Sequence, residues 1–317
     1  MTNLVQFPGL GLSFELSRVA FSIGDMDIYW YGVCIAFGLC LALVFAFRRC
    51  TEFGIDADSM VDVILIGVVL GIASARLYYV AMAPYNYDTI WDVLAVRDGG
   101  LAIYGGIIAA ALTLIVFCRI RKISFFSFAD LGVHGLLIGQ CIGRWGNFMN
   151  VEAYGGVTGL PWRMCSESIA SSLLSQGLVD ADGYQAILDG TLGVHPTFFY
   201  ESLWNFVGIF LIYWIGKHWK KFDGQVFWSY VLWYGLGRFW IEGLRTDSLY
   251  FFGLELFGAP IRTSQVLAIV SAAVAAVVLI YELKFRRHDP SELYVNRLAA
   301  HRADAGEGPG GPEKKED

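Results

Sequence analysis

Seven long apolar runs constrain this chain more than any other feature of its sequence. They fall at about residues 28–47, 61–82, 101–118, 128–147, 198–216, 226–244 and 263–283. A helix that crosses the hydrocarbon core of a bilayer needs roughly 20 mostly apolar residues. With 56% hydrophobic and 16% charged residues in 317, the chain has too little polar surface to cover soluble domains. The sequence therefore predicts an all-α, polytopic membrane protein with seven transmembrane helices.

Basic residues predict the orientation of these helices. Clusters follow the first, third, fifth and seventh runs: Arg48 and Arg49; Arg119, Arg121 and Lys122; Lys217, Lys220 and Lys221; Lys284, Arg286 and Arg287. The opposite side carries sparse basic residues: Arg18, Arg97, Arg163 and Arg262. Since Lys and Arg near span ends mark the cytoplasmic side, we expect the N-terminus outside and the C-terminus in the cytoplasm.

Two segments stand apart from the apolar runs. Residues 157–194 mix serines, acidic residues and apolar pairs, which favours a small folded insertion on the extracytoplasmic side. From about residue 289 the chain becomes polar and rich in glycine and proline, a composition typical of disorder. We expect a seven-helix membrane domain over residues 1–288, with the insertion at 157–194, and a disordered cytoplasmic tail over 289–317.

Unusual polar side chains concentrate at the predicted outer ends of the spans. They are Tyr31, Arg76, Tyr104, Arg144, Asn147, His195, Glu201, Arg238, Glu242 and Arg245. Charged residues within a membrane are costly and mark functional sites by default. Residues placed for structural reasons would not be expected to segregate to one side, so the segregation predicts a site at the outer face.

The arginines indicate what such a site binds. Taken alone, Arg144 also fits an arginine that snorkels to the interface. Tyr234, Arg238, Glu242 and Arg245 have spacings that place them along one helix face, and Arg238 with Glu242 also fits an internal ion pair. The arginines outnumber the nearby carboxylates, and a guanidinium fork suits phosphate. An anion such as a phospholipid headgroup is therefore the expected ligand.

The stretch over residues 143–155 carries a resemblance to a known family. It reads Gly-Arg-Trp-Gly-Asn-Phe-Met-Asn-Val-Glu-Ala-Tyr-Gly, which resembles the Gly-Arg-x-Gly-Asn-Phe-x-Asn-x-Glu-x-x-Gly motif of bacterial phosphatidylglycerol:prolipoprotein diacylglyceryl transferases. Residues 30–32, 99–106, 195–201 and 234–245 also resemble family motifs, in the family order. The predicted seven-span layout, with its site facing outward, is similar to the family's as well.

The resemblance implies an enzyme of lipoprotein maturation in the bacterial plasma (inner) membrane, with its active site toward the extracytoplasmic face. Its implied partners are phosphatidylglycerol, the lipid bilayer and the signal peptide of a prolipoprotein with its lipobox cysteine. The diacylglyceryl group moves to the cysteine thiol, a thioether forms and glycerol 1-phosphate leaves. We expect no cofactor, no metal and no nucleic-acid partner.

The chemistry assigns roles to the candidate residues. Negative charge grows on the phosphate as it leaves, so fixed guanidiniums lower the barrier, and we assign Arg144 and Arg238 to that role. Substrate-binding residues are expected to be Arg144, Asn147, Asn150, Glu152, Gly155, Tyr31, Tyr234, Glu201, Glu242, Arg245 and Arg76. Tyr31 and Tyr234 would donate hydrogen bonds, and Glu201, Glu242 and His195 would brace the rim.

The group that accepts the thiol proton stays open. Many family members have histidine between the paired glycines, where this chain has Tyr104. A phenol, with a reference pKa near 10, accepts the proton of a thiol of pKa about 8.5 poorly. Three possibilities remain open: Tyr104 as a donor or base, His195 as the base, and a thiolate stabilised by Arg144 or Arg238. The catalytic candidates are Arg144, Arg238, Tyr104 and His195.

Other functional classes fit the sequence less well. A transporter or channel should carry polar residues toward both faces, whereas the cytoplasmic halves of these runs are apolar. Another lipid transferase would need an aspartate-rich metal motif, which the sequence lacks, or a His-x-x-x-x-Asp pair; the pair that the sequence has, His218 with Asp223, lies among the basic residues of the predicted cytoplasmic side. A receptor-like seven-helix protein predicts no arginine cluster at the outer ends. The sequence leaves open the preferred prolipoproteins and acyl chains, the role of residues 157–194 and the oligomeric state.

Overall fold

The computed structural model describes residues 2–83, 87, 89–94, 100–246, 250–256 and 259–304. The chain divides into two units, which are described separately below. The first unit comprises Met1–Phe45, Gly132–Lys220 and Gln225–Arg287. The second unit comprises Ala46–Leu131, Lys221–Gly224 and His288–Asp317. The boundary therefore falls within two of the long helices.

Each predicted apolar run forms a long helix. The helices are α1 Trp30–Arg49, α2 Ala57–Met82, α4 Ile103–Arg121, α5 Phe125–Asn150, α8 Thr197–His218, α9 Gln225–Leu244 and α10 Thr263–Ile280. Among the described residues, six helices are long and apolar enough to cross a membrane, namely all of these except α9. The protein is thus a mostly helical, multi-pass membrane protein, and the seventh crossing stays a prediction.

Short strands and helices complete the fold. The strands form antiparallel pairs: β1 Thr2–Phe7 with β2 Leu12–Ser17, β3 Val19–Ile23 with β4 Met26–Tyr29, β5 Val157–Thr158 with β6 Gly193–Val194, and β7 Tyr250–Leu256 with β8 Ala259–Arg262. The short helices are η1 Pro8–Leu10, η2 Cys50–Phe53, α3 Ile90–Leu94, α6 Glu167–Ser175, α7 Ala181–Leu188, η4 Tyr281–Phe285, η5 Pro290–Glu292 and α11 Tyr294–Asp304.

The strands correct the expectation of a purely helical chain. Along β1, Val5 and Phe7 are buried whereas Leu4 is exposed, which is the alternation typical of a half-buried strand. The alternation of buried and exposed side chains along β1 covers only six residues, which is far shorter than a transmembrane run. The mostly helical class is confirmed, with small hairpins added to it.

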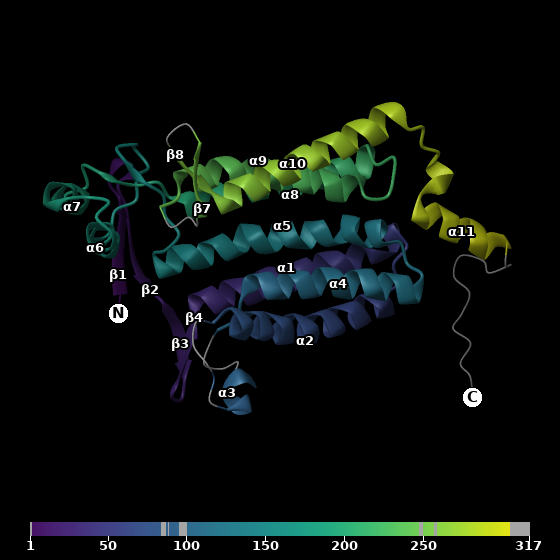
Figure 1. The fold of residues 1–317 in the computed structure, drawn as a ribbon, viewed down its shortest axis with the longest axis horizontal. Coiled ribbons are helices and arrows are strands. Elements are labelled where there is room, and N and C mark those ends of the chain that lie inside the picture. The colour runs from purple at the N-terminus through teal and green to yellow at the C-terminus, as the bar shows by residue number, and fades with distance from the viewer. Residues whose placement is uncertain are drawn as a thin grey trace. The chain divides into compact units, whose positions relative to one another are not determined.

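Glycines bring α1 and α5 close together in the first unit. A Cβ atom added at Gly38 would lie 3.4 Å from the Cα of Gly139, and one added at Gly146 would lie 2.8 Å from Cδ2 of Tyr31. Small residues at such contacts let membrane helices approach. In the same unit Trp204 of α8 stacks on Trp233 of α9, with ring centroids 4.2 Å apart, and α8, α9 and α10 run beside one another (Figure 1).

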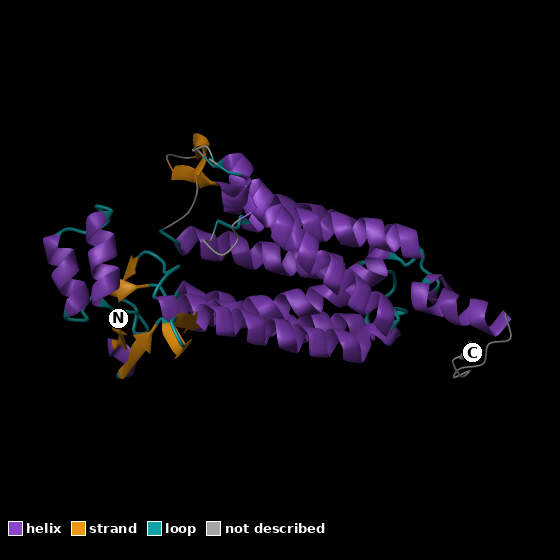
Figure 2. Cartoon of the chain, turned by 90° about the horizontal axis from the view of Figure 1, so that it is seen from below, coloured by secondary structure: helices purple, strands orange, loops and turns teal. Residues whose placement is uncertain are grey.

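One apolar core joins the N-terminal strands to residues 157–194. Its fully buried side chains include Val5, Ile169, Leu173 and Ile187. Figure 2 shows the strands of the first unit gathered at one end of its long helices, beside α6 and α7. The segment predicted as an insertion is therefore packed on β1 and β2, and its position outside the membrane stays a prediction.

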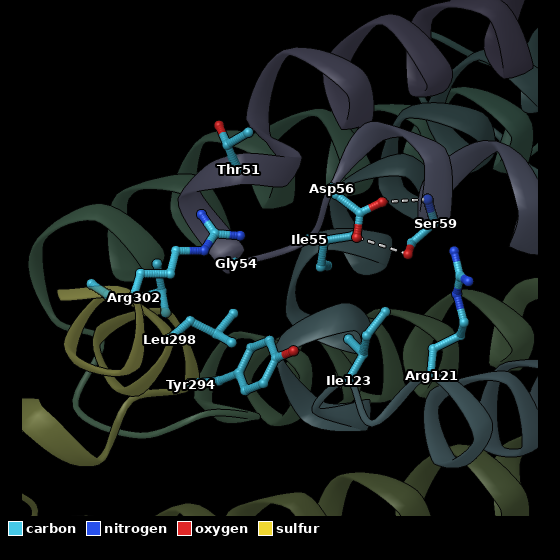
Figure 3. Close-up of a pocket in the computed structure, with 12 residues that line it drawn as sticks. Thr51, Gly54, Ile55, Asp56, Ser59, Arg121, Ile123, Tyr294, Leu298 and Arg302 are labelled. Carbon is cyan, nitrogen blue, oxygen red and sulfur yellow. Dashed lines mark hydrogen bonds between the residues drawn. The ribbon is translucent and has the colours of Figure 1, made fainter. Parts of the chain in front are cut away.

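In the second unit α2 and α4 lie side by side (Figure 1), and Asp56 caps the start of α2. Its carboxylate accepts hydrogen bonds from the backbone N–H and the hydroxyl of Ser59 at 2.7 and 2.8 Å, as an N-cap residue does. Burial acts to raise the pKa of Asp56, but the hydrogen bonds from Ser59 outweigh it and lower the pKa below its ordinary value. Beside this cap lies a cavity of about 530 Å³ (Figure 3).

Helix α11 forms where the sequence predicts a disordered tail from residue 289. The side chains of Tyr294 and Leu298 lie against Gly54 (Figure 3), and the backbone N–H of Tyr294 donates to Asp223 at 2.8 Å. A few apolar contacts and one cap thus order residues that are polar on average. Residues 305–317 lie outside the described residues.

We expect Gly54→Ala to loosen α11. Gly54 has a φ of +73°, and an added Cβ would lie 3.0 Å from Leu298 and 3.1 Å from Tyr294. A side chain in this left-handed conformation costs about 1–2 kcal/mol. Hydrogen exchange of residues 294–304 should become faster, while Gly67→Ala, a helix position with open space around it, should leave it unchanged. Equal protection in both variants would contradict the packing described for α11.

Candidate functional site

Arg144 lies near the end of α5, and two side chains hold its guanidinium. Its Nη1 donates to Oδ1 of Asn147, one turn further along the same helix, at 3.1 Å. Its Nη2 donates to Oε1 of Glu201, near the start of α8, at 2.7 Å. Asn147 thus contacts Arg144 within one helix, and Glu201 joins them from another.

Arg238 of α9 contacts the same glutamate. Its Nη1 donates to Oε2 of Glu201 at 3.2 Å, and its Nη2 lies 2.6 Å from Oε2 of Glu242, four residues later on α9. Glu201 and Glu242 are only 3% and 2% exposed. We call Arg144, Glu201, Arg238 and Glu242 the ion-pair network. It joins α5, α8 and α9 through one shared carboxylate.

Within these four residues the charges balance; the surplus of arginine expected from the sequence also counted Arg245, which is not one of the four. Two buried carboxylates face two guanidiniums, as buried charges require. The arginine side chains nevertheless remain 22% and 18% exposed for Arg144 and Arg238. A guanidinium has more N–H groups than these contacts use, so each arginine can still donate to an anion from its exposed side.

The end of α5 is held by a small polar cluster. Asn147 and Asn150 both donate from their side-chain amides to Oε1 of Glu152, at 3.0 and 3.1 Å. Val151 and Ala153 have positive φ values of 55° and 56°, a costly conformation for residues with a Cβ. Glu152 is therefore tied to Asn147, the residue that contacts Arg144, through one amide.

Gly155 lies in a short hydrogen-bonded ladder beside the network. Its N–H donates to the carbonyl of His195 at 2.9 Å, and the N–H of Gly156 donates to the carbonyl of Leu244 at 2.7 Å. A Cβ at Gly155 would lie 2.8 Å from Cβ of His195 and from that carbonyl oxygen, so only glycine fits. Arg245 pairs with Gly155 through a backbone bridge.

His195 contacts an aromatic pair. Its Nδ1 lies 3.2 Å from the hydroxyl of Tyr200, which also accepts a hydrogen bond from Nε1 of Trp162 at 2.6 Å. Burial lowers the pKa of His195 below its ordinary value, so the imidazole is neutral at pH 7 and can accept a proton. Within the described residues, no hydrogen bond or ion pair joins His195 to the ion-pair network.

Tyr31 and Tyr234, the predicted tyrosines of the first unit, pack in different ways. Tyr31, in the first turn of α1, packs on Gly146 of α5 and is 41% exposed. Tyr234 lies one turn before Arg238 and stacks on Tyr230, with ring centroids 5.7 Å apart. Tyr234 thus lies on a helix that carries the network, and Tyr31 packs on another of them, α5.

Arg76 and Tyr104 lie in the second unit. The guanidinium of Arg76 donates to three backbone carbonyls, those of Val93, Asp92 and Gly100, at 2.8, 2.6 and 3.2 Å. These bonds favour a role in holding the chain before α4 over contact with substrate. Tyr104, in the first turn of α4, is half exposed.

Two arginines contact the site although the sequence indicates no site role for them. Arg18 donates from Nη2 to the carbonyl of Asn150 at 3.2 Å, and Arg262 donates from Nη1 to the carbonyl of Glu242. Both were counted only among the sparse basic residues of the outer side. Their contacts are with backbone, which no side-chain motif reveals.

Comparison with known proteins shows the family of the chain. Residues 18–281 match the family model described as prolipoprotein diacylglyceryl transferase. The chain belongs to this family. A protein of Oceanobacillus iheyensis named phosphatidylglycerol–prolipoprotein diacylglyceryl transferase is 40% identical over 286 residues, which cover 89% of this chain and 92% of the relative. A protein of Bacillus cereus with the same name is 40% identical over 281 residues, covering 88% and 97%.

We expect Glu201→Gln to destabilise the protein, because Arg144 and Arg238 both lose a charged partner. Breaking a buried pair costs about 3 kcal/mol or more, and inorganic phosphate should restore part of that loss by replacing the missing negative charge. Thermal unfolding in detergent, with and without phosphate, measures both effects. Glu15→Gln, at an exposed position, is the control. A variant as stable as the parent would mean that Glu201 does not hold the arginines.

Proposed function

We propose that this protein transfers the diacylglyceryl group of phosphatidylglycerol to the lipobox cysteine of prolipoproteins, the first step of lipoprotein maturation. The observation that carries the proposal is the position of Arg144 and Arg238 on opposite oxygens of the buried Glu201. The names of the curated relatives, at 40% identity over most of the chain, support the same reaction.

In the proposed reaction, the cysteine sulfur attacks the terminal glyceryl carbon of the lipid. The bond from that carbon to the phosphate oxygen breaks, its electron pair stays on the phosphate, and a carbon–sulfur bond forms. Glycerol 1-phosphate leaves, and the thiol proton goes to a base. Arg144 and Arg238 donate to the phosphate oxygens on which charge develops, a preorganised form of stabilisation.

The surrounding residues would hold this arrangement. Glu201 and Glu242 fix the two guanidiniums, and Asn147 fixes Arg144 from the side. In the proposal, Asn150, Glu152 and Gly155 shape the end of α5, while Tyr31, Tyr234 and Arg245 line the place of the headgroup. Arg76 acts by holding the chain before α4.

Three candidates for the proton acceptor stay in the proposal. His195 is supported by its lowered pKa, which leaves it neutral at pH 7. Tyr104 stands where many family members have histidine, and a phenol serves better as a donor than as a base at neutral pH. Direct attack by a thiolate stabilised by Arg144 or Arg238 needs no separate side-chain base in the complex.

The proposal places the site at the extracytoplasmic face of the bacterial plasma membrane. Helix α9 would be the seventh crossing, since Arg238 and Glu242 are neutralised within the network and the rest of the helix is largely apolar. The basic clusters after α1, α4, α8 and α10 then lie in the cytoplasm. An exported cysteine meets the site only in this orientation.

One assay tests the function directly. Membranes that contain the protein are incubated with a lipobox peptide and with phosphatidylglycerol labelled in the glyceryl carbons of its diacylglyceryl group. Label on the peptide cysteine, stable to hydroxylamine as a thioether is, supports the proposal. Label that stays in lipid, or that attaches when the cysteine is replaced by serine, contradicts it.

In this assay Arg144→Ala and Arg238→Ala should each lower the rate about a hundredfold or more, as loss of one donor to a developing charge does. The Lys variants should recover only part of the rate, because the planar fork is lost. Lys217→Ala, at an exposed position in the last turn of α8, serves as the control. Near-parental activity in either alanine variant that inserts normally would make that arginine structural.

Tyr104→Phe should reduce transfer without abolishing it, and Tyr104→His should remain active. The reason is that a phenol donates a hydrogen bond readily but takes a thiol proton poorly at neutral pH. The pH–rate profile of the Phe variant should keep its shape and lose amplitude. Complete loss in a folded Phe variant, restored by His, would show that the proton passes through position 104.

Topology is tested with reporters. A fusion after Lys221 should report the cytoplasm, and one placed within residues 165–190 should report the outside, because the basic clusters fix the orientation. The reverse result would put the site on the cytoplasmic face and remove it from any exported acceptor.

A further inference from the structure

For most of its length, strand β1 has a strand partner along just one of its two edges. The register opposes Gln6 to Ser13 and Val5 to Phe14 of β2. The N–H and carbonyl of Gln6 bond to Cys165 instead, both at 2.8 Å, so they point away from β2. Backbone groups alternate along a strand, so those of Leu4 and Thr2 point the same way as those of Gln6. Among the described residues, no backbone group forms a hydrogen bond with Thr2 or Leu4 on the edge away from β2.

A cavity lies along this open edge. Its volume is about 440 Å³, and its other walls are the start of α6 and the end of α7. Leu4 and Gln6 line it together with Ser166, Glu167 and Ser171. The lining is mainly polar, and Glu167 is its charged member among the described residues. We call this cavity the β1 groove. Hydroxyls, a carboxylate and free main-chain groups suit a polypeptide and do not suit an acyl chain.

A continuous ladder of hydrogen bonds links the β1 groove to the candidate site. Cys165 bonds to Gln6, the adjacent Met164 exchanges two bonds with Val194, and the next residue, His195, exchanges bonds with Gly155 and Gly156. Gly155 in turn bridges to Arg245 of the site. The groove is therefore built on the same segments that end at the site, within one unit of the chain.

We propose that the β1 groove binds an extended polypeptide, which adds a strand to β1 through Thr2 and Leu4. The occupant is the segment of the acceptor protein that follows its lipid-acceptor cysteine. An open strand edge is a ready template for such pairing, and Glu167 favours neutral or basic residues in the bound segment. This choice of occupant rests on the function proposed above. A transferase that acts on a cysteine of a secreted protein must also accommodate the residues that follow the cysteine.

The test compares two lipobox peptides in the transfer assay. One ends about 3 residues after the cysteine and the other continues for about 15, which span roughly 50 Å when extended. The parent enzyme should show a lower KM for the long peptide. Leu4→Pro removes the N–H that faces the groove, and one backbone hydrogen bond is worth about fivefold. That variant should raise the KM for the long peptide by about this factor and leave the short peptide and kcat unchanged.

Two variants are matched controls. Ser13→Pro removes an N–H on the outer edge of β2, away from the groove, and Leu4→Ala keeps the N–H while it removes the side chain. Ser13→Pro should leave the preference for the long peptide unchanged, and Leu4→Ala should reduce it less than Leu4→Pro does. In the parent enzyme, hydrogen exchange at Leu4 should also slow on addition of the long peptide, which tests the groove without any variant.

The outcomes separate the two proposals. Equal KM values for the two peptides, or unchanged exchange at Leu4, would overturn the β1 groove while transfer itself continues. An equal effect of Ser13→Pro would also overturn it. Absence of transfer to both peptides would instead overturn the proposed function, and the assigned occupant with it.

Discussion

The carboxylate of Glu201 is the interaction on which the candidate site depends. It is almost fully buried, and its two oxygens accept from guanidiniums of two different helices. A buried carboxylate without these partners would be strongly unfavourable, and each arginine would lose its position. The same contact therefore neutralises charge within the membrane domain and sets the two guanidiniums side by side. Glu242 completes the balance on Arg238.

Close helix packing makes this contact possible. Glycines let α1 approach α5, and the stacked Trp204 and Trp233 fix α8 against α9. Arginines held in this way need little reorganisation when charge develops on a bound phosphate, which is the main source of electrostatic catalysis. The ladder through Gly155 then ties the site to the strands and short helices at that end of the unit. Backbone hydrogen bonds thus join the long helices of this unit to the strands and short helices at their end.

Much of this could be predicted from the sequence because it depends on local patterns. The helices follow from apolar runs of sufficient length, and the ion pair between Arg238 and Glu242 follows from their spacing of four. The shared role of Glu201 could not be predicted, because it depends on how three helices pack. From the sequence Glu201 is expected to brace the rim, and the structure shows its carboxylate between Arg144 and Arg238. The short strands and α11 were not predicted, because their apolar residues are few and the segments are much shorter than a transmembrane run.

The most direct measurement is an experimental structure of the protein with phosphatidylglycerol in nanodiscs. The account predicts phosphate oxygens within about 3 Å of the guanidiniums of both Arg144 and Arg238, while Glu201 stays bonded to both. A headgroup bound elsewhere, with the two arginines contacting only their carboxylates, would contradict the central claim that Glu201 holds them for the phosphate.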